Sequence, residues 1–450
     1  MSMRVHFIAI GGSAMHNLAI ALHKKGYQIT GSDDQIFEPS RSRLAKYGLL
    51  PEQDNWNPQI ITEDIEAIIL GMHARKDNPE LLIATELGLK IYSYPEYIFQ
   101  QSQNKKRIVI GGSHGKTSIT SMILHVLKVL DRKFDYLVGA ELEGYETMVS
   151  LNDEHDLIIL EGDEYLSSPI DLRPKFHWYK ADIAILTGIA WDHINVFPSF
   201  ENYVEQFDIF IESMNTGSKL FYYSDDDELQ KLANVKRSHT ALFPYNTPKY
   251  EIKDSNYQVE GYPLKIFGEH NLQNMEAARL VLKELGIESQ EFYEAMGSFS
   301  GATKRLELIR EESNFLAYKD FAHSPSKLKA TTKAVKDHYP DRKLVACMEL
   351  HTFSSLNKKF LPQYKDAMLA ADEAIVYFNP KTLIHKKLEA LSKEEVHDAF
   401  GQKNLKVFTD SDELMNHLRA KSWADCNLLL MSSGNFNGQS FEELAESLSV

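Results

Sequence analysis

The chain has 450 residues, 43 % hydrophobic and 25 % charged, and this length exceeds the usual size of one hydrophobic core, so two to three domains are expected. A formal net charge of −15 argues against nucleic-acid and acidic-membrane partners, because phosphate-rich surfaces are bound by basic stripes. Cys347 and Cys426 are the only cysteines, which excludes disulfide frameworks and cysteine-rich zinc modules and predicts a cytoplasmic location. No apolar run approaches the roughly 20 residues that span a bilayer, which excludes membrane helices.

The first part of the chain, up to about residue 104, alternates short apolar runs with amphipathic stretches. Strands are predicted at residues 5–10, 27–30 and 67–70, with a helix that ends near Lys25 between the first two. Such alternation is typical of parallel βαβ units. We therefore expect an α/β fold that begins with a Rossmann-like domain.

A glycine-rich turn follows the first predicted strand. The stretch Ala9-Ile10-Gly11-Gly12-Ser13-Ala14-Met15 lies where a dinucleotide fingerprint would, although alanines occupy its first and last glycine positions. Asp33 follows about twenty residues later, where Rossmann proteins bind a ribose hydroxyl. The turn predicts a nucleotide or nucleotide-sugar site, and a tight turn without a ligand is the alternative. The candidate residues are Gly11, Gly12, Ser13, Ala14, Ser32 and Asp33.

A second glycine-rich turn is a much more specific signal. A β-branched strand at residues 107–110 leads into Gly111-Gly112-Ser113-His114-Gly115-Lys116-Thr117-Ser118, and a helix-like run follows. In such a turn backbone N–H groups cradle phosphates, the helix N-terminus adds partial positive charge, and lysine and threonine supply a cation and a Mg²⁺ ligand. Ile110 replaces the first glycine of the common phosphate loop, so the match is to the shorter form G-[ST]-x-G-K-T. The alternative is a chance Gly-Lys-Thr in a surface loop.

Carboxylates and a histidine follow two further predicted strands. The strand at 157–160 runs into Glu161, and the strand at 183–187 leads to Asp192 and His193. Ligands of α/β sheets bind at the carboxyl ends of the strands, so these side chains are candidate metal ligands. A solvated acidic loop and a structural histidine are the alternatives.

From residue 314 a third alternating section begins. Its predicted strands are at residues 344–348, 374–378, 406–408 and 427–431, which indicates another doubly wound sheet. The three domains are expected at residues 1–104, 105–300 and 301–450.

Read in order, these motifs resemble the Mur ligase family. Three further stretches carry the resemblance: Gly268-Glu269-His270-Asn271-Leu272-Gln273-Asn274, Lys304-Arg305-Leu306-Glu307 and Asp320-Phe321-Ala322-His323-Ser324-Pro325. The resemblance covers essentially the whole chain. It implies an N-terminal domain that binds the UDP part of a UDP-muramoyl substrate, a central P-loop ATPase domain and a Rossmann-like C-terminal domain that receives the amine.

The resemblance also implies a chemistry in which a carboxylate takes the ATP γ-phosphoryl group and an amine then attacks the acyl phosphate. Catalysis then depends on positioning and cationic stabilisation. Lys116 is expected to bind the ATP phosphates, and the residues expected to bind Mg²⁺ are Thr117, Glu161 and His193. The other implied ATP contacts are Gly112, Ser113, His114, Gly115, Ser118, Asn271, Asn274 and Arg305, and the catalytic candidates are Lys116, His193, Arg305, Asp320 and His323.

The later motifs have structural alternatives. Asn271 is also a plausible helix cap, Arg305 a solvated linker charge, and Asp320 with His323 a loop that satisfies its own backbone.

The acceptor substrate is predicted from features in which this sequence resembles one branch of the family more than the others. No lysine occurs between His193 and Lys219, which resembles the branch without a carbamylated lysine, acting on UDP-N-acetylmuramate. The segments 320–323, 348–352 and 431–438 resemble members that attach L-alanyl-γ-D-glutamyl-meso-diaminopimelate during peptidoglycan recycling, and L-alanine is the alternative acceptor. The expected acceptor-binding arginine is missing, and Ser324 replaces a second histidine. The acceptor candidates are Glu349, His351, Thr352 and Ser354.

Two interpretations lie outside this family. A nicotinamide-dependent dehydrogenase would use the first turn and Asp33 but leaves Lys116, Glu161 and His193 without a joint role. A non-catalytic P-loop regulator would use the second turn alone. The expected partners are small-molecule substrates, with a monomer or weak homodimer as the assembly.

Overall fold

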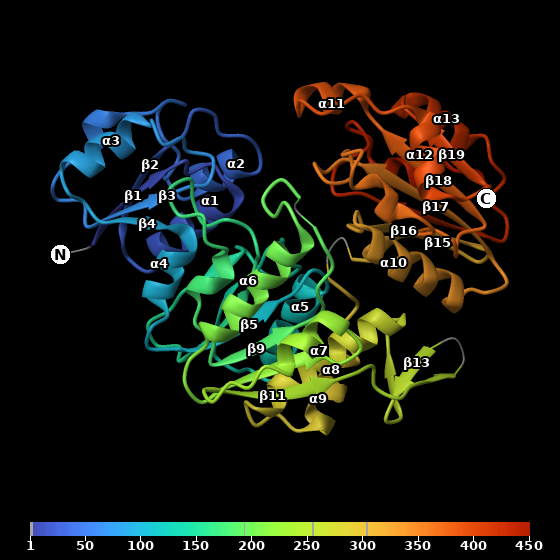
Figure 1. Ribbon diagram of the computed structural model, residues 1–450, viewed down its shortest axis with the longest axis horizontal. Helices are drawn as coiled ribbons and strands as arrows, with labels where there is room; N and C mark the ends of the chain where they lie inside the picture. Colours follow the sequence, from blue (N-terminus) through green and yellow to red (C-terminus); the bar gives the residue numbers. More distant parts are fainter. Residues whose placement is uncertain (1–2, 193, 254–255, 303–304) are drawn as a thin grey trace. The chain divides into compact units, whose positions relative to one another are not determined.

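The computed structural model describes residues 3–192, 194–253, 256–302 and 305–450, and Figure 1 labels its helices and strands. The chain divides into two compact units. The first contains Met1–Gly112, Ile123–Ile189 and Val204–Tyr245, and the second contains Ser113–Met122, Ala190–Tyr203 and Asn246–Val450. Two β-sheets are described in each unit.

The first sheet of the first unit has four parallel strands in the order β2-β1-β3-β4. They are β1 (Arg4–Ile8), β2 (Gln28–Ser32), β3 (Ala67–Leu70) and β4 (Ile91–Ser93). The connecting helices are α1 (Ser13–Lys24), α2 (Ser40–Lys46), α3 (Pro79–Glu86) and α4 (Tyr94–Gln101), with a 3-10 turn η1 (Pro58–Ile60). Strand β3 is wholly buried, as its continuous apolar run predicts for a parallel sheet. Leu81 and Ala84 of α3 share a core with Ile8, Ile68 and Leu70.

The second sheet of this unit has seven strands in the order β11-β10-β9-β5-β8-β6-β7, of which only β7 is antiparallel to its neighbour. They are β5 (Lys106–Gly111), β6 (Asp135–Leu137), β7 (Val149–Ser150), β8 (Leu157–Glu161), β9 (Ile183–Leu186), β10 (Ser218–Tyr223) and β11 (Thr240–Tyr245). The helical elements of this part of the chain are α5 (Lys116–Val129), η2 (Lys175–Trp178), α6 (Phe200–Glu212) and α7 (Asp227–Ala233). Because β5 lies between β8 and β9, the residues that follow these three parallel strands share one sheet edge.

The second unit contains a small antiparallel sheet that the apolar pattern did not predict. Its strands are β12 (Glu251–Lys253), β13 (Asn256–Val259) and β14 (Tyr262–Leu264). All three described residues of β12 are exposed and Pro263 lies within β14, so neither strand shows a clean apolar alternation. Helices α8 (Glu269–Lys283) and α9 (Ser289–Met296) follow.

A six-stranded sheet in the order β15-β16-β20-β17-β18-β19 completes the second unit. Its strands are β15 (Glu307–Glu312), β16 (Phe315–Asp320), β17 (Lys343–Leu350), β18 (Glu373–Phe378), β19 (Leu405–Phe408) and β20 (Cys426–Met431). The helices are α10 (Pro325–His338), α11 (Pro380–His385), α12 (Lys393–Phe400), α13 (Ser411–Arg419) and α14 (Phe441–Ser447), with η3 (Leu361–Tyr364). Only β15 runs antiparallel to its neighbour.

Helices cover both faces of this sheet, as Figure 1 shows for the orange and red part of the chain. Along β17, Leu344 and Ala346 share one core with α10 and α12, whereas Val345 and Cys347 share the other with α13 and α14. Successive side chains of a strand point to opposite faces, so a strand buried on both sides reads as a continuous apolar run.

The predicted α/β class and the doubly wound third section are confirmed, and each strand predicted from an apolar run is present to within a few residues. The domain boundaries near residues 104 and 300 stay a prediction. No helix among the described residues is long and apolar enough to cross a membrane.

Candidate active site

The first glycine-rich turn is fastened to the end of β2. The backbone N–H groups of Ala9 and Ile10 donate to the carbonyl oxygen of Ser32 at 2.9 and 3.0 Å, and the N–H of Gly11 donates to Asp33 Oδ2 at 2.8 Å. A Cβ on Gly11 would lie 2.9 Å from that oxygen, so only glycine permits this close approach. The other oxygen, Asp33 Oδ1, accepts from the N–H of Asp34 at 3.0 Å. Asp33 therefore braces the turn, and its expected contact with a ribose hydroxyl stays a prediction.

The remaining predicted residues of this turn lie around the start of α1. Gly12 is the N-cap residue, the exposed Ser13 directs its hydroxyl to Met148 Sδ at 3.5 Å, and Ala14 is half-buried. The hydroxyl of Ser32 instead donates to the buried carboxylate of Glu80. The accessible edge of the turn is therefore formed by residues 11–14.

Asp33 makes a pH-dependent contribution to stability. Burial raises its pKa from 3.8 to about 6, while the N–H of Gly11 opposes this shift. An acid with a higher pKa in the folded than in the unfolded state holds its proton more tightly when folded, so the free energy of unfolding falls as pH rises through this window and levels off above it. The expected loss is on the order of 1 to 3 kcal/mol.

Asp33→Asn removes this titration, because an amide carries no such proton. We expect the unfolding temperature of the variant to rise relative to that of the natural protein between pH 4 and pH 6, measured by thermal unfolding of both in parallel. A difference that stays constant across this pH range would contradict the assignment.

The second glycine-rich turn leaves β5 through a position where no side chain fits. Gly112 has a φ of +122°, and a Cβ there would lie 2.1 Å from Thr187 Oγ1 and 2.8 Å from the Thr187 backbone nitrogen. Thr187 directly follows β9, the neighbour of β5. Glycine is therefore required at position 112 both by the backbone conformation and by the neighbouring strand end.

The rest of this turn belongs to the second unit and is held by buried polar contacts. The hydroxyl of Ser113 accepts from the N–H of Ala190 at 2.8 Å and bonds to the Tyr203 hydroxyl at 2.9 Å. Gly115 has a φ of +77°, and a Cβ there would lie 2.4 Å from Asn274 Oδ1. Asn274, predicted as an ATP contact, is thus packed directly against the turn.

Arg305 reaches the same turn from the chain segment before β15. Its guanidinium donates to Thr117 Oγ1 at 3.4 Å and lies over the Phe321 ring, 4.7 Å from the centroid. The buried Asp320 carboxylate accepts from the N–H groups of Leu306 and Ala322 at 2.6 and 2.7 Å. Burial raises the pKa of Asp320, and the charge of Arg305 and the backbone donors oppose it. Asp320 therefore anchors the segment that carries Arg305 and also satisfies the loop after β16.

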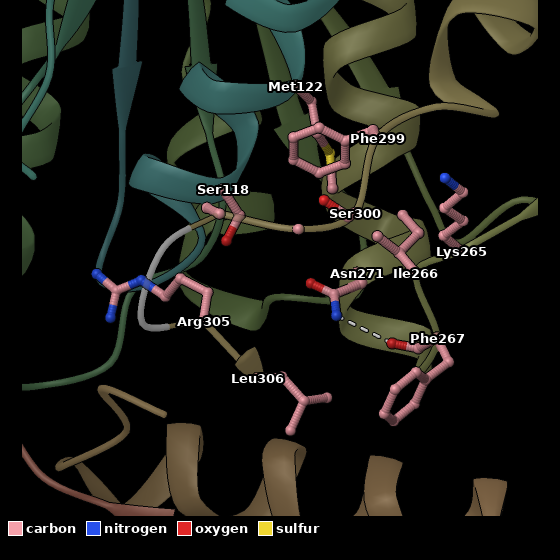
Figure 2. A pocket seen from close by; sticks show the side chains of 12 residues that line it. Ser118, Met122, Lys265, Ile266, Phe267, Asn271, Phe299, Ser300, Arg305 and Leu306 are labelled. Carbon is pink, nitrogen blue, oxygen red and sulfur yellow. Dashed lines mark hydrogen bonds between the residues drawn. The ribbon is translucent and has the colours of Figure 1, made fainter. Parts of the chain in front are cut away.

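A pocket opens beside these residues. Its wall is apolar at Ile266, Phe267 and Phe299, and its polar members include Ser118, Asn271 and Arg305. Figure 2 shows these side chains around the pocket, with the dashed bond from Asn271 Nδ2 to the Phe267 carbonyl oxygen at 2.9 Å. An apolar wall with a few polar groups is the usual composition of a small-ligand site. Asn271 is thus brought to the pocket, and its amide also satisfies a backbone carbonyl near the start of α8.

His323 is buried with a defined ring orientation. Its Nδ1 bonds to the Phe321 carbonyl oxygen at 2.8 Å, so Nδ1 carries the proton and donates. Its Nε2 lies 3.9 Å from Asp192 Oδ2. Burial and the positive charge of Lys327 lower the pKa of His323, against the raising effect of Asp192, so the ring is neutral at pH 7. A neutral ring with a lone pair on Nε2 can accept a proton or bind a cation.

The predicted metal ligands are only partly described. Glu161 ends β8 and is buried, and one of its oxygens, Oε2, accepts from the N–H of Gly139 at 2.8 Å. His193 lies outside the described residues, as does Lys304. Among the residues that are described, no group of three or more His, Cys, Asp or Glu side chains is arranged to bind a metal ion. The oxygens of Glu161 and Thr117 suit Mg²⁺, which prefers one or two protein ligands together with phosphate oxygens and water.

The predicted acceptor residues lie at the end of β17. Glu349 Oε2 accepts from the N–H of Phe436 at 3.0 Å and from the Ser432 hydroxyl, and its Oε1 lies 3.6 Å from His351 Nδ1. Its carboxylate thus ties the loop after β20 to β17. Thr352 bonds to Ser355, with its Oγ1 3.0 Å from Ser355 Oγ. Ser354 is buried, whereas His351 and Thr352 are half-buried and remain accessible.

Three residues of this region were missed by sequence reasoning. Thr187 was within reach of the sheet-edge argument, because it is the last residue of a predicted strand. Gly139 and Tyr203 lie 22 and 90 residues from their partners Glu161 and Ser113, so no local pattern marks them.

Models of known protein families match the chain almost from end to end. The chain matches "Mur ligase family, catalytic domain" over residues 4–106, "Mur ligase middle domain" over residues 110–282 and "Mur ligase, glutamate ligase domain" over residues 304–434. A UDP-N-acetylmuramate–L-alanine ligase from Caldicellulosiruptor bescii is 30 % identical over 387 residues, which cover 82 % of each chain. A protein of the same description from Carboxydothermus hydrogenoformans is 28 % identical over 465 residues, covering 99 % of this chain and 97 % of its own.

Two solved structures share the fold. A murein peptide ligase from Psychrobacter arcticus superposes with a TM-score of 0.67 at 20 % identity and covers 99 % of this chain and 98 % of its own. A UDP-N-acetylmuramate–alanine ligase from Thermotoga maritima superposes with a TM-score of 0.70 at 20 % identity, covering 97 % and 96 %. At such identities the likeness shows the fold alone, and the sequence matches supply the family. The chain belongs to the Mur ligase family, whose members are ATP-dependent enzymes that join a carboxylate to an amine.

Proposed function

We propose that this ligase joins the lactyl carboxylate of UDP-N-acetylmuramate to the amino group of a peptide, with Mg²⁺ as the metal cofactor. The observation that carries the proposal is the turn after β5, where Gly112 and Gly115 occupy positions that no side chain fits. Backbone N–H groups of such a turn and the start of α5 form an anion site. The accessible turn at residues 11–14 supports a place for the UDP group at the first sheet.

The residues of the second turn supply binding and charge. Lys116 would bind the phosphate oxygens, and Arg305, which already donates to Thr117, would add a second cation nearby. The pocket that Asn271 lines would receive the adenine ring. In the proposed reaction the muramoyl carboxylate attacks the γ-phosphorus and the bond to ADP breaks; the amine then attacks the acyl carbon and inorganic phosphate leaves. Charge on the phosphoryl oxygens is the feature that the cations stabilise.

Mg²⁺ would neutralise phosphoryl charge when bound, and Thr117, Glu161 and His193 would bind it. Glu161 fits this role, because its N–H donor from Gly139 fixes the orientation of a carboxylate that ends a strand. His323 fits a role with the incoming amine, because its neutral ring has a lone pair on Nε2.

The acceptor we propose is L-alanyl-γ-D-glutamyl-meso-diaminopimelate. It is supported by the sequence of the segments 320–323 and 431–438, and by His351 and Thr352, which stay accessible at the end of β17. The absence of an arginine in this stretch counts against this acceptor, because an arginine would supply a bidentate partner for a carboxylate of the peptide. Free L-alanine is the second candidate, and it is favoured by the descriptions of the two relatives reported above.

The test is a steady-state assay of phosphate release with ATP, Mg²⁺ and UDP-N-acetylmuramate, comparing kcat/KM for the tripeptide and for L-alanine. We expect the tripeptide to give the higher value. A higher value for L-alanine would assign the chain to the alanine-adding branch. No release with any amine, in the presence of UDP-N-acetylmuramate, would overturn the proposed donor.

A further inference from the structure

A buried polar cluster lies inside the N-terminal α/β sheet, directly behind the first glycine-rich turn. Its members are His6 in β1, Ser32 at the end of β2 and Glu80 in α3, and their exposed fractions are 0 %, 3 % and 0 %. Buried ionisable side chains are rarely kept in a small core, because an apolar replacement is often neutral or stabilising. This cluster therefore calls for a role beyond packing.

Both oxygens of Glu80 are engaged. Oε2 accepts from the Ser32 hydroxyl and lies 3.2 Å from His6 Nε2, and Oε1 accepts from the N–H of Asn57 at 2.5 Å. The other ring nitrogen of His6 bonds to Thr30 Oγ1 at 2.9 Å. Burial acts to raise the pKa of Glu80, but the bonds from His6, Ser32 and Asn57 outweigh it and hold the pKa below its ordinary value. The group is thus a carboxylate at neutral pH.

One partner of Glu80, Ser32, also holds the first glycine-rich turn in place. Ser32 supplies the carbonyl oxygen that accepts from Ala9 and Ile10, and the next residue, Asp33, accepts from Gly11. On its other side Asp33 forms a bridge with Asn55, two residues before the Asn57 N–H that Glu80 binds. One carboxylate therefore fixes both backbone segments that flank Asp33.

We propose that Glu80 is a positioning residue for the UDP substrate, holding the end of β2 and the segment at residues 55–57 so that the turn at residues 11–14 keeps its binding shape. The inference rests on the proposed binding of UDP-N-acetylmuramate at this turn. Glu80 itself is fully buried, so it acts through Ser32, Asn57 and His6.

The test is Glu80→Gln in the full-length protein, with Glu86→Gln as the matched control, because Glu86 lies on the same helix and is exposed. An amide offers one acceptor oxygen where the network uses two, so the bond from the Ser32 hydroxyl or the bond from the Asn57 N–H has to break or reverse its direction. We expect the Kd for UDP-N-acetylmuramate, measured by isothermal titration calorimetry, to rise about 10- to 100-fold. The Kd for ADP should be unchanged in the same preparation, which a general loss of folded protein would not allow.

Ser32→Ala provides a second route if Glu80→Gln does not fold, because it removes one hydrogen bond and no charge. It should weaken UDP-N-acetylmuramate binding in the same direction, and the double variant should be weakened less than the product of the two single effects. If the natural protein binds UDP-N-acetylmuramate and either folded single variant binds it equally well, the positioning role of Glu80 is overturned and the proposed function stands. Natural protein that does not bind UDP-N-acetylmuramate would overturn the proposed function, and the inference with it.

Discussion

Lys116→Ala is expected to lower kcat for ligation about 10²- to 10³-fold, because it removes a cation from the oxygens on which charge develops during phosphoryl transfer. Lys116 is the first residue of α5 and is half-buried rather than part of a core. Its removal should therefore leave the unfolding temperature nearly unchanged. The measurement is phosphate release at saturating UDP-N-acetylmuramate and acceptor, together with thermal unfolding of the same sample.

Lys128→Ala is the matched control for this variant. Lys128 lies in the last turn of the same helix, is exposed, and donates to the Gly144 carbonyl oxygen. The two substitutions remove the same side chain from one helix, but only the first is at the end where the helix N-terminus favours anions. Equal activity of both variants would remove Lys116 from the phosphate site.

The turn after β5 could be predicted from sequence because all its parts are contiguous. A strand, a glycine-rich turn and a helix start appear within one short stretch, and each has a physical signature that no distant residue has to supply. The same holds for the strands of the third section, which are buried on both faces and therefore read as continuous apolar runs. Family membership also decides against the dehydrogenase and the non-catalytic regulator as interpretations of these turns.

The polar frameworks around the site could not be predicted in this way. Glu80 and Ser32 are 48 residues apart, and Glu349 and Ser432 are 83 residues apart, so their pairing depends on the tertiary fold. Asp33 illustrates the limit of a positional argument. Its spacing from the first turn indicates a contact with a ribose hydroxyl, yet both its oxygens accept backbone N–H groups. Sequence spacing alone does not distinguish an aspartate that binds a ligand from one that binds the backbone.

The strongest test of the turn geometry is Gly112→Ala, which should raise the KM for ATP about 100-fold or more and also lower the unfolding temperature. Two effects combine. An L-residue with a φ of +122° is strained by about 1–3 kcal/mol, and the added methyl would lie 2.8 Å from the backbone nitrogen of Thr187. A backbone atom at the end of a central strand cannot rotate away, so the turn itself has to move.

Gly26→Ala separates strain from collision, because Gly26 also has a positive φ, +92°, but a Cβ there would meet nothing within 4 Å. It should lose stability and keep the KM for ATP. Adding Thr187→Ala to Gly112→Ala removes the hydroxyl that would lie 2.1 Å from the new methyl but leaves the backbone nitrogen in place, so ATP binding should recover only in part. Full recovery would mean that the Thr187 side chain alone sets the shape of the turn, and an unchanged KM for ATP in Gly112→Ala itself would show that this glycine does not shape the nucleotide site.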